Sequence, residues 1–110
     1  MTNTNITDAI INFVSICQEA KDNYFAVNYK NLKPSLFKIY KGRKFAKVTT
    51  TSDGGLGQEC VFCFIDKSNG MIYKPAGYNS RAKHARGNVL SVKSGRESLD
   101  YSQQHIRYLK

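Results

Sequence analysis

The chain has 110 residues, of which 17 are Lys or Arg and eight are Asp or Glu, giving a formal net charge of +9. This length supports one hydrophobic core, so we expect a single domain over residues 1–110. Three cysteines are too few for a secreted disulfide scaffold, and the longest apolar run, 61–65, is too short to cross a bilayer. The first residues also lack the positive segment that opens a signal peptide. These features predict an intracellular location and no membrane partner.

The positive charge is concentrated in two blocks. Residues 21–51 hold eight basic residues and one acidic residue, and residues 67–96 hold seven basic residues and none that is acidic. Residues 52–66, between the two blocks, hold three acidic residues and no basic one. A charge distribution of this kind attracts polyanions and makes their binding sensitive to salt. The alternative is a solvated lysine-rich surface with no specific partner.

The first predicted element is an amphipathic helix over residues 7–21. Apolar residues recur there at helical spacing, Thr7 fits the N-cap position, and Asp8 lies in the first turn. Ile11 and Ile16 widen the apolar stripe. We therefore expect one side of the helix to be covered by a sheet, and we predict a homodimer through another side.

From residue 24 the apolar period changes to two, which is typical of β-strands. The predicted strands cover residues 24–29, 35–40 and 45–51. A turn at 41–43 joins the last two into a hairpin. Lys38, Lys41 and Lys47 occupy alternate positions among its apolar residues. One face of this hairpin should therefore be apolar while the other presents ammonium groups.

The middle of the chain predicts a second hairpin. Residues 53–57 form a glycine-rich, flexible connection, and residues 60–66 are apolar on both faces, as in a central strand. The tight turn at 67–70 contains Asn-Gly, which favours positive φ, and leads into a strand at 71–74. Pro75 and the glycine that follows end this strand.

Three further elements complete the prediction: a short helical turn at 80–86, a brief strand at 89–92 and a terminal helix over 98–109. The predicted fold is therefore α+β. It consists of an antiparallel sheet of about four to five strands, with an N-terminal helix and a C-terminal helix packed on one face.

No catalytic pattern emerges from the sequence. In a regular strand Cys60 and Cys63 point to opposite faces and cannot easily share a metal ion, and His84 and His105 lack ligand spacing. The glycines at 53–57 lack the flanking strand, helix and Gly-Lys-Ser/Thr of nucleotide-binding loops. No nucleophile elbow or convergent carboxylate pair is present. We therefore predict a protein that is not an enzyme and that uses neither a metal nor another cofactor.

The stretch 73–88 interleaves basic and aromatic residues. Arg and Lys side chains contact phosphates, while Tyr rings stack on exposed bases. With the lysines of the first hairpin this stretch predicts a nucleic-acid-binding surface. Its members are Lys38, Lys41, Arg43, Lys44, Lys47, Lys74, Tyr78, Arg81, Lys83 and Arg86, with Tyr73 as a further stacking candidate. The alternative is that the basic residues decorate an exposed turn while Tyr73 and Tyr78 pack in the core.

The string IDKSNGMIYKPAGYNSRAKHARGNV covers about a quarter of the chain. It resembles a hairpin-plus-basic-loop pattern, I-D-K-x-x-G-x-I-Y-K-P-A followed by A-K-x-x-R-G-N, of small uncharacterised proteins of bacteriophages and related viruses. At Gly77-Tyr78 the match is loose. The resemblance implies a viral accessory or virion protein, in the cytoplasm of an infected cell or in the virion, and implies no catalytic residues.

The sequence thus predicts a small basic protein that binds DNA or RNA through the nucleic-acid backbone, with little sequence specificity. One form of this prediction is that the bound nucleic acid is single-stranded. The alternative is a viral structural or interaction protein whose basic face docks on an acidic protein.

Overall fold

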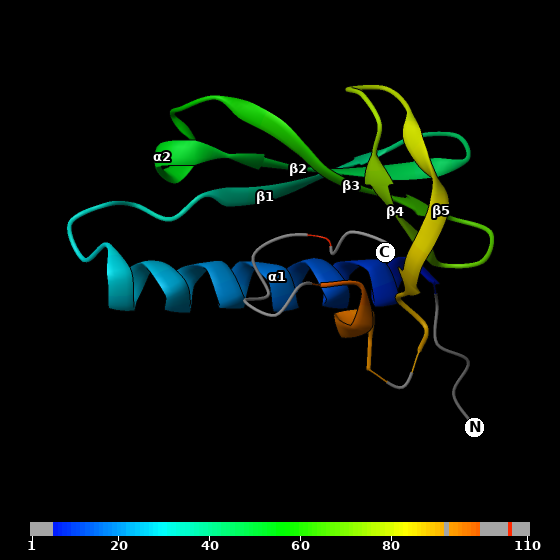
Figure 1. The fold of residues 1–110 in the computed structure, drawn as a ribbon, viewed down its shortest axis with the longest axis horizontal. Coiled ribbons are helices and arrows are strands. Elements are labelled where there is room, and N and C mark those ends of the chain that lie inside the picture. Colours follow the sequence, from blue (N-terminus) through cyan, green and yellow to red (C-terminus); the bar gives the residue numbers. More distant parts are fainter. Residues whose placement is uncertain (1–5, 92, 100–105, 107–110) are drawn as a thin grey trace.

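The computed structural model describes residues 6–91, 93–99 and 106. A long helix packs along one side of a five-stranded antiparallel sheet (Figure 1). The elements are α1 (Ile6–Asn28), β1 (Leu36–Lys41), β2 (Phe45–Thr51), α2 (Ser52–Gly55), β3 (Glu59–Asp66), β4 (Met71–Pro75), β5 (Arg81–Asn88) and the 3-10 helix η1 (Arg96–Ser98). The two layers confirm the predicted α+β class. No helix in the described ranges is long and apolar enough to span a membrane.

Helix α1 continues beyond the predicted end at residue 21, so the strand predicted at 24–29 is wrong. The segment contains no Gly or Pro to stop the helix. The amide of Tyr29 donates to the carbonyl of Phe25 at 2.8 Å, and the two ring centroids lie 5.2 Å apart. Side chains four residues apart are neighbours on a helix, so these aromatic contacts stabilise the helical alternative.

The five strands form a meander in the order β1-β2-β3-β4-β5. The predicted hairpin between β3 and β4 is confirmed. Gly70 has a φ of 81°, and its amide donates to the carbonyl of Asp66 at 2.7 Å. The carboxylate of Asp66 accepts hydrogen bonds from the amide and the hydroxyl of Ser68. Local turn chemistry therefore specifies this reversal.

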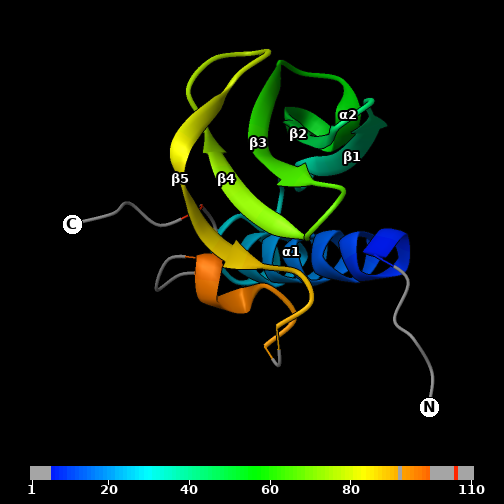
Figure 2. The ribbon, with the colours of Figure 1, turned by 90° about the vertical axis from the view of Figure 1, so that its right-hand side faces the viewer.

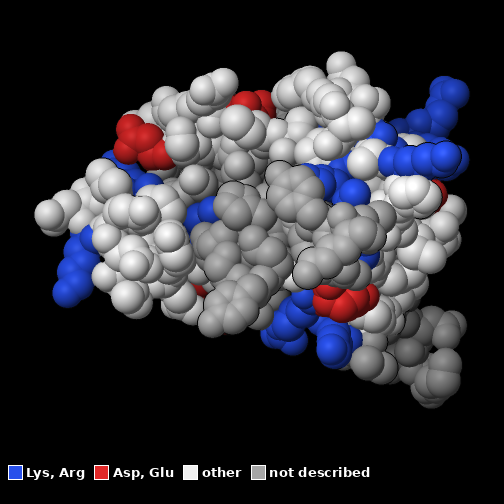
Figure 3. Space-filling model, viewed as in Figure 1, with Lys and Arg blue, Asp and Glu red and all other residues white. Residues whose placement is uncertain are grey.

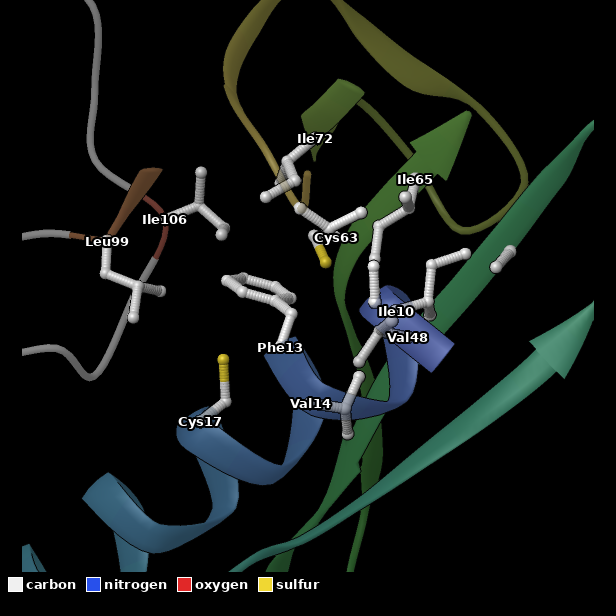
Figure 4. Close-up of a cluster of buried hydrophobic side chains, with 13 residues drawn as sticks. Ile10, Phe13, Val14, Cys17, Val48, Cys63, Ile65, Ile72, Leu99 and Ile106 are labelled. Carbon is white, nitrogen blue, oxygen red and sulfur yellow. The ribbon is translucent and has the colours of Figure 1, made fainter. Parts of the chain in front are cut away.

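The core lies between α1 and the sheet face that α1 covers, here called the inner face (Figure 4). Phe13 projects from α1 and is fully buried, as are Cys63 and Ile72 on the sheet. Beside Phe13, the side chains of Leu99 and Ile106 close the core from the region beyond β5. Residues from both ends of the chain thus share one core.

A β-bulge interrupts the pairing of β2 with β3. Val48 pairs with Cys63, but the next residue of β2, Thr49, pairs with Val61, which leaves Phe62 as an extra residue. Such a bulge shifts the alternation of side chains by one position. Residues of β3 that precede it therefore lie on the side opposite to the one that strict alternation predicts.

The bulge also places Cys60 and Cys63 on one side of the sheet, where opposite sides were predicted. The β2 partners of Cys60 and Cys63 are Thr50 and Val48, which lie two residues apart, so the cysteines share a side of the sheet. Cys60 is exposed, whereas Cys63 is buried. Across the described residues, no group of three His, Cys, Asp or Glu side chains could hold a metal ion.

The region after β4 differs most from the prediction. Residues 81–88 form strand β5 instead of a helical turn, because they pair with β4, which would otherwise be an open sheet edge. Val89 and Leu90 lie in a turn rather than in a strand, and residue 92 is outside the described residues.

Of the predicted terminal helix, only the short turn η1 is present in the described residues. Leu99 and Ile106 form an antiparallel bridge, which a continuous helix over 98–109 would not allow. The remainder of that predicted helix lies outside the described residues.

Candidate functional site

The sheet face that points away from α1, here called the outer face, carries the candidate site. Strand register places one row of side chains across all five strands: Tyr40, Lys47, Phe64, Tyr73 and Ala85. On β2, β3 and β4 the adjacent residues Val48, Cys63 and Ile72 point inward and belong to the core. Alternation along each strand therefore separates the core from a row in which a lysine lies among three aromatic rings.

A second row lies beside the first, towards the end of the sheet where α2 begins. Lys38 pairs with Thr49, and Thr49 pairs with Val61. Glu59 belongs to the same side because it follows the new alternation set by the bulge. Thr49 is fully buried although it faces away from the core. The outer face is therefore packed by its own side chains rather than being a bare polar surface.

The loop between β4 and β5, residues 76–80, rises on the side of the sheet away from α1 (Figures 1 and 2). The ammonium nitrogen of Lys47 lies 3.8 Å from the ring centroid of Tyr78 and 3.1 Å from Oδ1 of Asn79. These contacts bring the two basic blocks of the sequence together on one face. Tyr78 keeps 53% of its surface exposed and Tyr40 keeps 37%.

Arg81 extends the same surface towards the opposite end of the sheet. Its guanidinium carbon lies 4.2 Å from the ring centroid of Tyr73 and 5.6 Å from that of Phe45. Nζ of Lys44 lies 5.5 Å from the Phe45 ring. Because ring faces attract cations, these contacts hold the positive groups over aromatic surface. Arg81, Lys44 and Lys47 are thus ordered by the rings of the outer face.

A carboxylate lies inside this basic and aromatic surface. Oε2 of Glu59 accepts hydrogen bonds from the hydroxyls of Tyr40 and Thr49, each at 2.8 Å. Its Oε1 accepts a longer one, at 3.4 Å, from Tyr78. The hydrogen bonds from Tyr40 and Thr49, helped by nearby Lys38, hold the pKa of Glu59 below its usual value. The charge of Glu59 in turn raises the pKa of Tyr78.

Three more predicted residues lie in or next to the turn between β1 and β2. Lys41, Arg43 and Lys44 are exposed there. Nζ of Lys67, from the β3–β4 turn, donates to the carbonyl of Gly42 at 2.8 Å. Figure 3 shows basic side chains projecting at the end of the sheet where these two turns meet. Lys41 pairs with the buried Ala46 and therefore lies towards the inner side of this end.

The structure does not bring Lys74 or Arg86, two other predicted residues, to the outer face. Nζ of Lys74 donates to the carbonyl of Ile106 at 3.2 Å, on the side of the sheet that faces the core. Nε and Nη1 of Arg86 are buried, which withdraws them from phosphates in solvent. Lys83 is exposed on β5, at the edge of the sheet. Of these three residues, only Lys83 is available to a ligand without rearrangement.

The buried thiols are not poised for nucleophilic chemistry. Burial raises the pKa of Cys17 to about 12 and raises that of Cys63 well above its usual value. His84 is exposed on β5, and His105 lies outside the described residues. The glycine-rich segment 53–57 begins in α2, where Asp53 and Gly54 both have positive φ. Within the described residues, neither the buried thiols, nor His84, nor the glycine-rich segment forms a catalytic arrangement with the outer face.

Sequence reasoning missed several members of the outer face. Tyr40 and Phe45 flank predicted lysines at alternate positions, so period-two counting could have found them. Glu59 lies on the outer face because of the bulge in β3, and the sequence holds no signal for that bulge. The contact of Tyr78 with β2 depends on where the β4–β5 loop folds, which local sequence patterns do not indicate.

The chain matches the model of a family described as a family of unknown function (DUF7717), over residues 2–108. No curated protein matches it. No solved structure matches it either.

Proposed function

We propose that this chain, which belongs to the DUF7717 family of unknown function, binds single-stranded nucleic acid on the outer face of its sheet. Lys38, Lys47 and Arg81 contact phosphates, while Tyr78 and Tyr40 stack on bases. Affinity comes mainly from the backbone, so binding tolerates many sequences. The protein acts by binding, without a chemical step.

The observation that carries this proposal is the convergence of the two basic blocks around exposed rings. Lys47 and Tyr78 are distant in sequence, yet the lysine lies 3.8 Å from the ring centroid. A solvated lysine-rich surface has no need of such ordering, because isolated exposed cations are well hydrated. A surface that binds a strand needs cations and rings at fixed relative positions, since each nucleotide presents a phosphate beside a flat base.

The rings favour a single strand over a duplex. In a duplex the base faces are stacked on one another, so aromatic side chains reach them only after unstacking. Tyr78 and Tyr40 are partly exposed on an open sheet face and can accept an unpaired base directly. The exposed residues Arg43 and Lys44 can then contact phosphates of the same strand beyond the stacked bases.

Fluorescence anisotropy with labelled single-stranded DNA and RNA of about 12 nucleotides tests this proposal over a series of salt concentrations. We expect log Kd to rise linearly with log salt, at about 0.7 for each phosphate contact on a single strand. Lys47→Ala should weaken binding and reduce this slope by about one contact. The matched control is Lys30→Ala, an exposed lysine of the connection between α1 and β1.

Two outcomes would overturn the proposal. One is the absence of binding at low ionic strength. The other is an equal loss of affinity in the Lys30→Ala and Lys47→Ala variants, which would indicate a general charge effect. Polyglutamate that competes as strongly as an oligonucleotide would instead support an acidic protein as the partner.

Two features that the sequence indicated stay predictions. The resemblance to small phage proteins implies that binding serves a viral accessory role in an infected cell. Homodimerisation through α1 is consistent with two exposed apolar residues of that helix, Ile11 and Val27, which are exposed at 48% and 75%. Sedimentation of the free protein would test the second of these.

A further inference from the structure

We propose that Glu59 makes the outer face selective for guanine within a bound single strand. This inference rests on the proposed function and adds a base preference to binding that is otherwise directed at the backbone. The carboxylate of Glu59 lies inside a surface whose basic residues attract phosphates. A neutral residue at the same position would repel a nucleic-acid backbone less.

The carboxylate is held in place by hydroxyl donors from two strands. Tyr40 on β1 and Thr49 on β2 both donate to Oε2 at 2.8 Å. Thr49 is fully buried, so this part of the site is packed rather than mobile. Hydrogen bonding also holds the pKa of Glu59 low, so that the group is ionised at neutral pH. The site therefore presents an oriented anionic acceptor.

One oxygen of this carboxylate retains acceptor capacity. Each carboxylate oxygen can accept two hydrogen bonds. Among the described residues, Oε2 accepts two, whereas Oε1 accepts only the long one from Tyr78, at 3.4 Å. Glu59 is half-buried rather than enclosed, and Tyr78 is exposed. A ligand can therefore reach Oε1, and the weak Tyr78 bond is the one it would replace.

The exposed rings bring a base edge to this oxygen. Tyr40 and Tyr78 both point their hydroxyl groups at Glu59, so the carboxylate lies at the polar end of each ring. A base stacked on either ring and extending past the hydroxyl presents its Watson–Crick edge to Oε1. Stacking and edge recognition are thus available to the same base.

A carboxylate can only accept hydrogen bonds, and this determines which base it favours. Guanine offers two adjacent donors on its Watson–Crick edge, N1–H and the N2 amino group. Thymine and uracil offer a single N–H between two carbonyl oxygens, which a carboxylate repels. Adenine and cytosine offer one amino group beside a ring nitrogen that is an acceptor. Guanine is therefore the base that best complements Glu59.

Three single strands of about 12 nucleotides test this inference by anisotropy: all thymine, alternating thymine and guanine, and alternating thymine and inosine. Inosine lacks only the N2 amino group of guanine. We expect the guanine strand to bind about tenfold more tightly than the thymine strand, as for one good base contact. The inosine strand should lose part of that advantage.

The variant Glu59→Gln separates base recognition from a structural role. Glutamine keeps an oxygen that accepts from Tyr40 and Thr49 but has lost the negative charge. We expect it to bind the thymine strand more tightly, because repulsion of the backbone falls, while the ratio of guanine to thymine affinity falls towards one. The urea midpoint of the variant at neutral pH shows whether it remains folded. The comparison of the guanine and inosine strands uses the wild-type protein and therefore does not depend on the folding of a variant.

The outcomes are distinguishable. Equal affinity of the wild type for the guanine and thymine strands overturns the inference but leaves single-strand binding intact. A guanine preference that is unchanged in folded Glu59→Gln also overturns it. Failure of all three strands to bind at low salt overturns the proposed function itself.

Discussion

The two faces of the sheet are built from the same strands but from different chemistry. On the inner face, Val48, Cys63 and Ile72 are fully buried against α1. On the outer face, Lys47 and Tyr73 come from positions directly adjacent to such residues. Lys47 contacts the ring of Tyr78, and Tyr73 contacts the guanidinium of Arg81. The inner face buries apolar area, which stabilises the fold, whereas the outer face keeps charges and rings accessible. This difference implies that stability and binding can be changed independently, and four predictions test that separation.

The largest expected effect is on the inner face. Phe13 is fully buried at the centre of the core, so Phe13→Ala leaves a cavity and should lower the free energy of unfolding by about 3–5 kcal/mol. Urea denaturation followed by circular dichroism measures this change. Ile11→Ala, on the same helix but at an exposed position, should cost far less. Equal losses for the two variants would contradict this placement of the core.

A smaller loss of stability is expected at Gly95, where the backbone lies close to the core. Gly95 has a φ of 91°, and an added Cβ would lie 2.6 Å from Cδ1 of Phe13 and 3.0 Å from Cδ1 of Ile72. Gly95→Ala should therefore destabilise the protein by about 2–4 kcal/mol, from strain and overpacking together. Gly77→Ala, in the exposed β4–β5 loop, is the control for urea unfolding. An unchanged free energy of unfolding in Gly95→Ala would show that residues 93–99 do not pack closely against the core.

On the outer face, the effect should appear in affinity rather than in stability. Tyr78→Ala removes a stacking ring and should weaken single-strand binding by about 1–3 kcal/mol, or about 5- to 150-fold. Its urea midpoint should stay close to that of the wild type, because the ring is half exposed. Tyr78→Phe should retain most of the affinity. Tyr29→Ala, at an exposed tyrosine just after α1, should bind normally, and a loss there equal to that of Tyr78→Ala would argue against stacking on the outer face.

The smallest effect concerns pH. Hydrogen bonds from Tyr40 and Thr49 lower the pKa of Glu59 from its usual 4.5, so the ionised group favours the folded state. This contribution is present above pH 4.5 and is lost as the pH falls through the lower folded-state pKa. Urea midpoints from about pH 7 to about pH 3 should fall further for the wild type than for Glu59→Gln. Asp66 and Glu97, whose pKa values are also lowered, are common to both proteins. Parallel pH profiles would show that the hydroxyl contacts do not stabilise the ionised form.

Elements with strong local signals were predictable. The Asn-Gly turn needs positive φ at Gly70, and this requirement is visible in the sequence without knowledge of the fold. The start of α1 and the hairpin at 35–51 were likewise indicated by periodicity and by turn residues. The prediction failed where local preference was weak and tertiary partners decided, as for Tyr24 to Tyr29 and for residues 80–86.

The residue types of the candidate site could be predicted from the sequence, but the individual residues that form it could not. Alternation alone indicates that Lys38 and Lys47 share a wet face of the first hairpin. It could not show that Tyr78 reaches Lys47, because that contact spans residues far apart in sequence. Nor could it show that Lys74 contacts Ile106 on the other side of the sheet. Long-range contacts leave no trace in local spacing.

By itself, the sequence determined the charge of the molecule, its α+β class and the alternation that separates lysines from core residues, since these follow from composition and from side-chain period. Only the tertiary structure decided which of those lysines meet the aromatic rings. The bulge at Phe62 turns Glu59 outward, and the fold of the β4–β5 loop carries Tyr78 over β2. Both depend on packing between strands, and a one-residue shift in register changes the side on which every following residue lies.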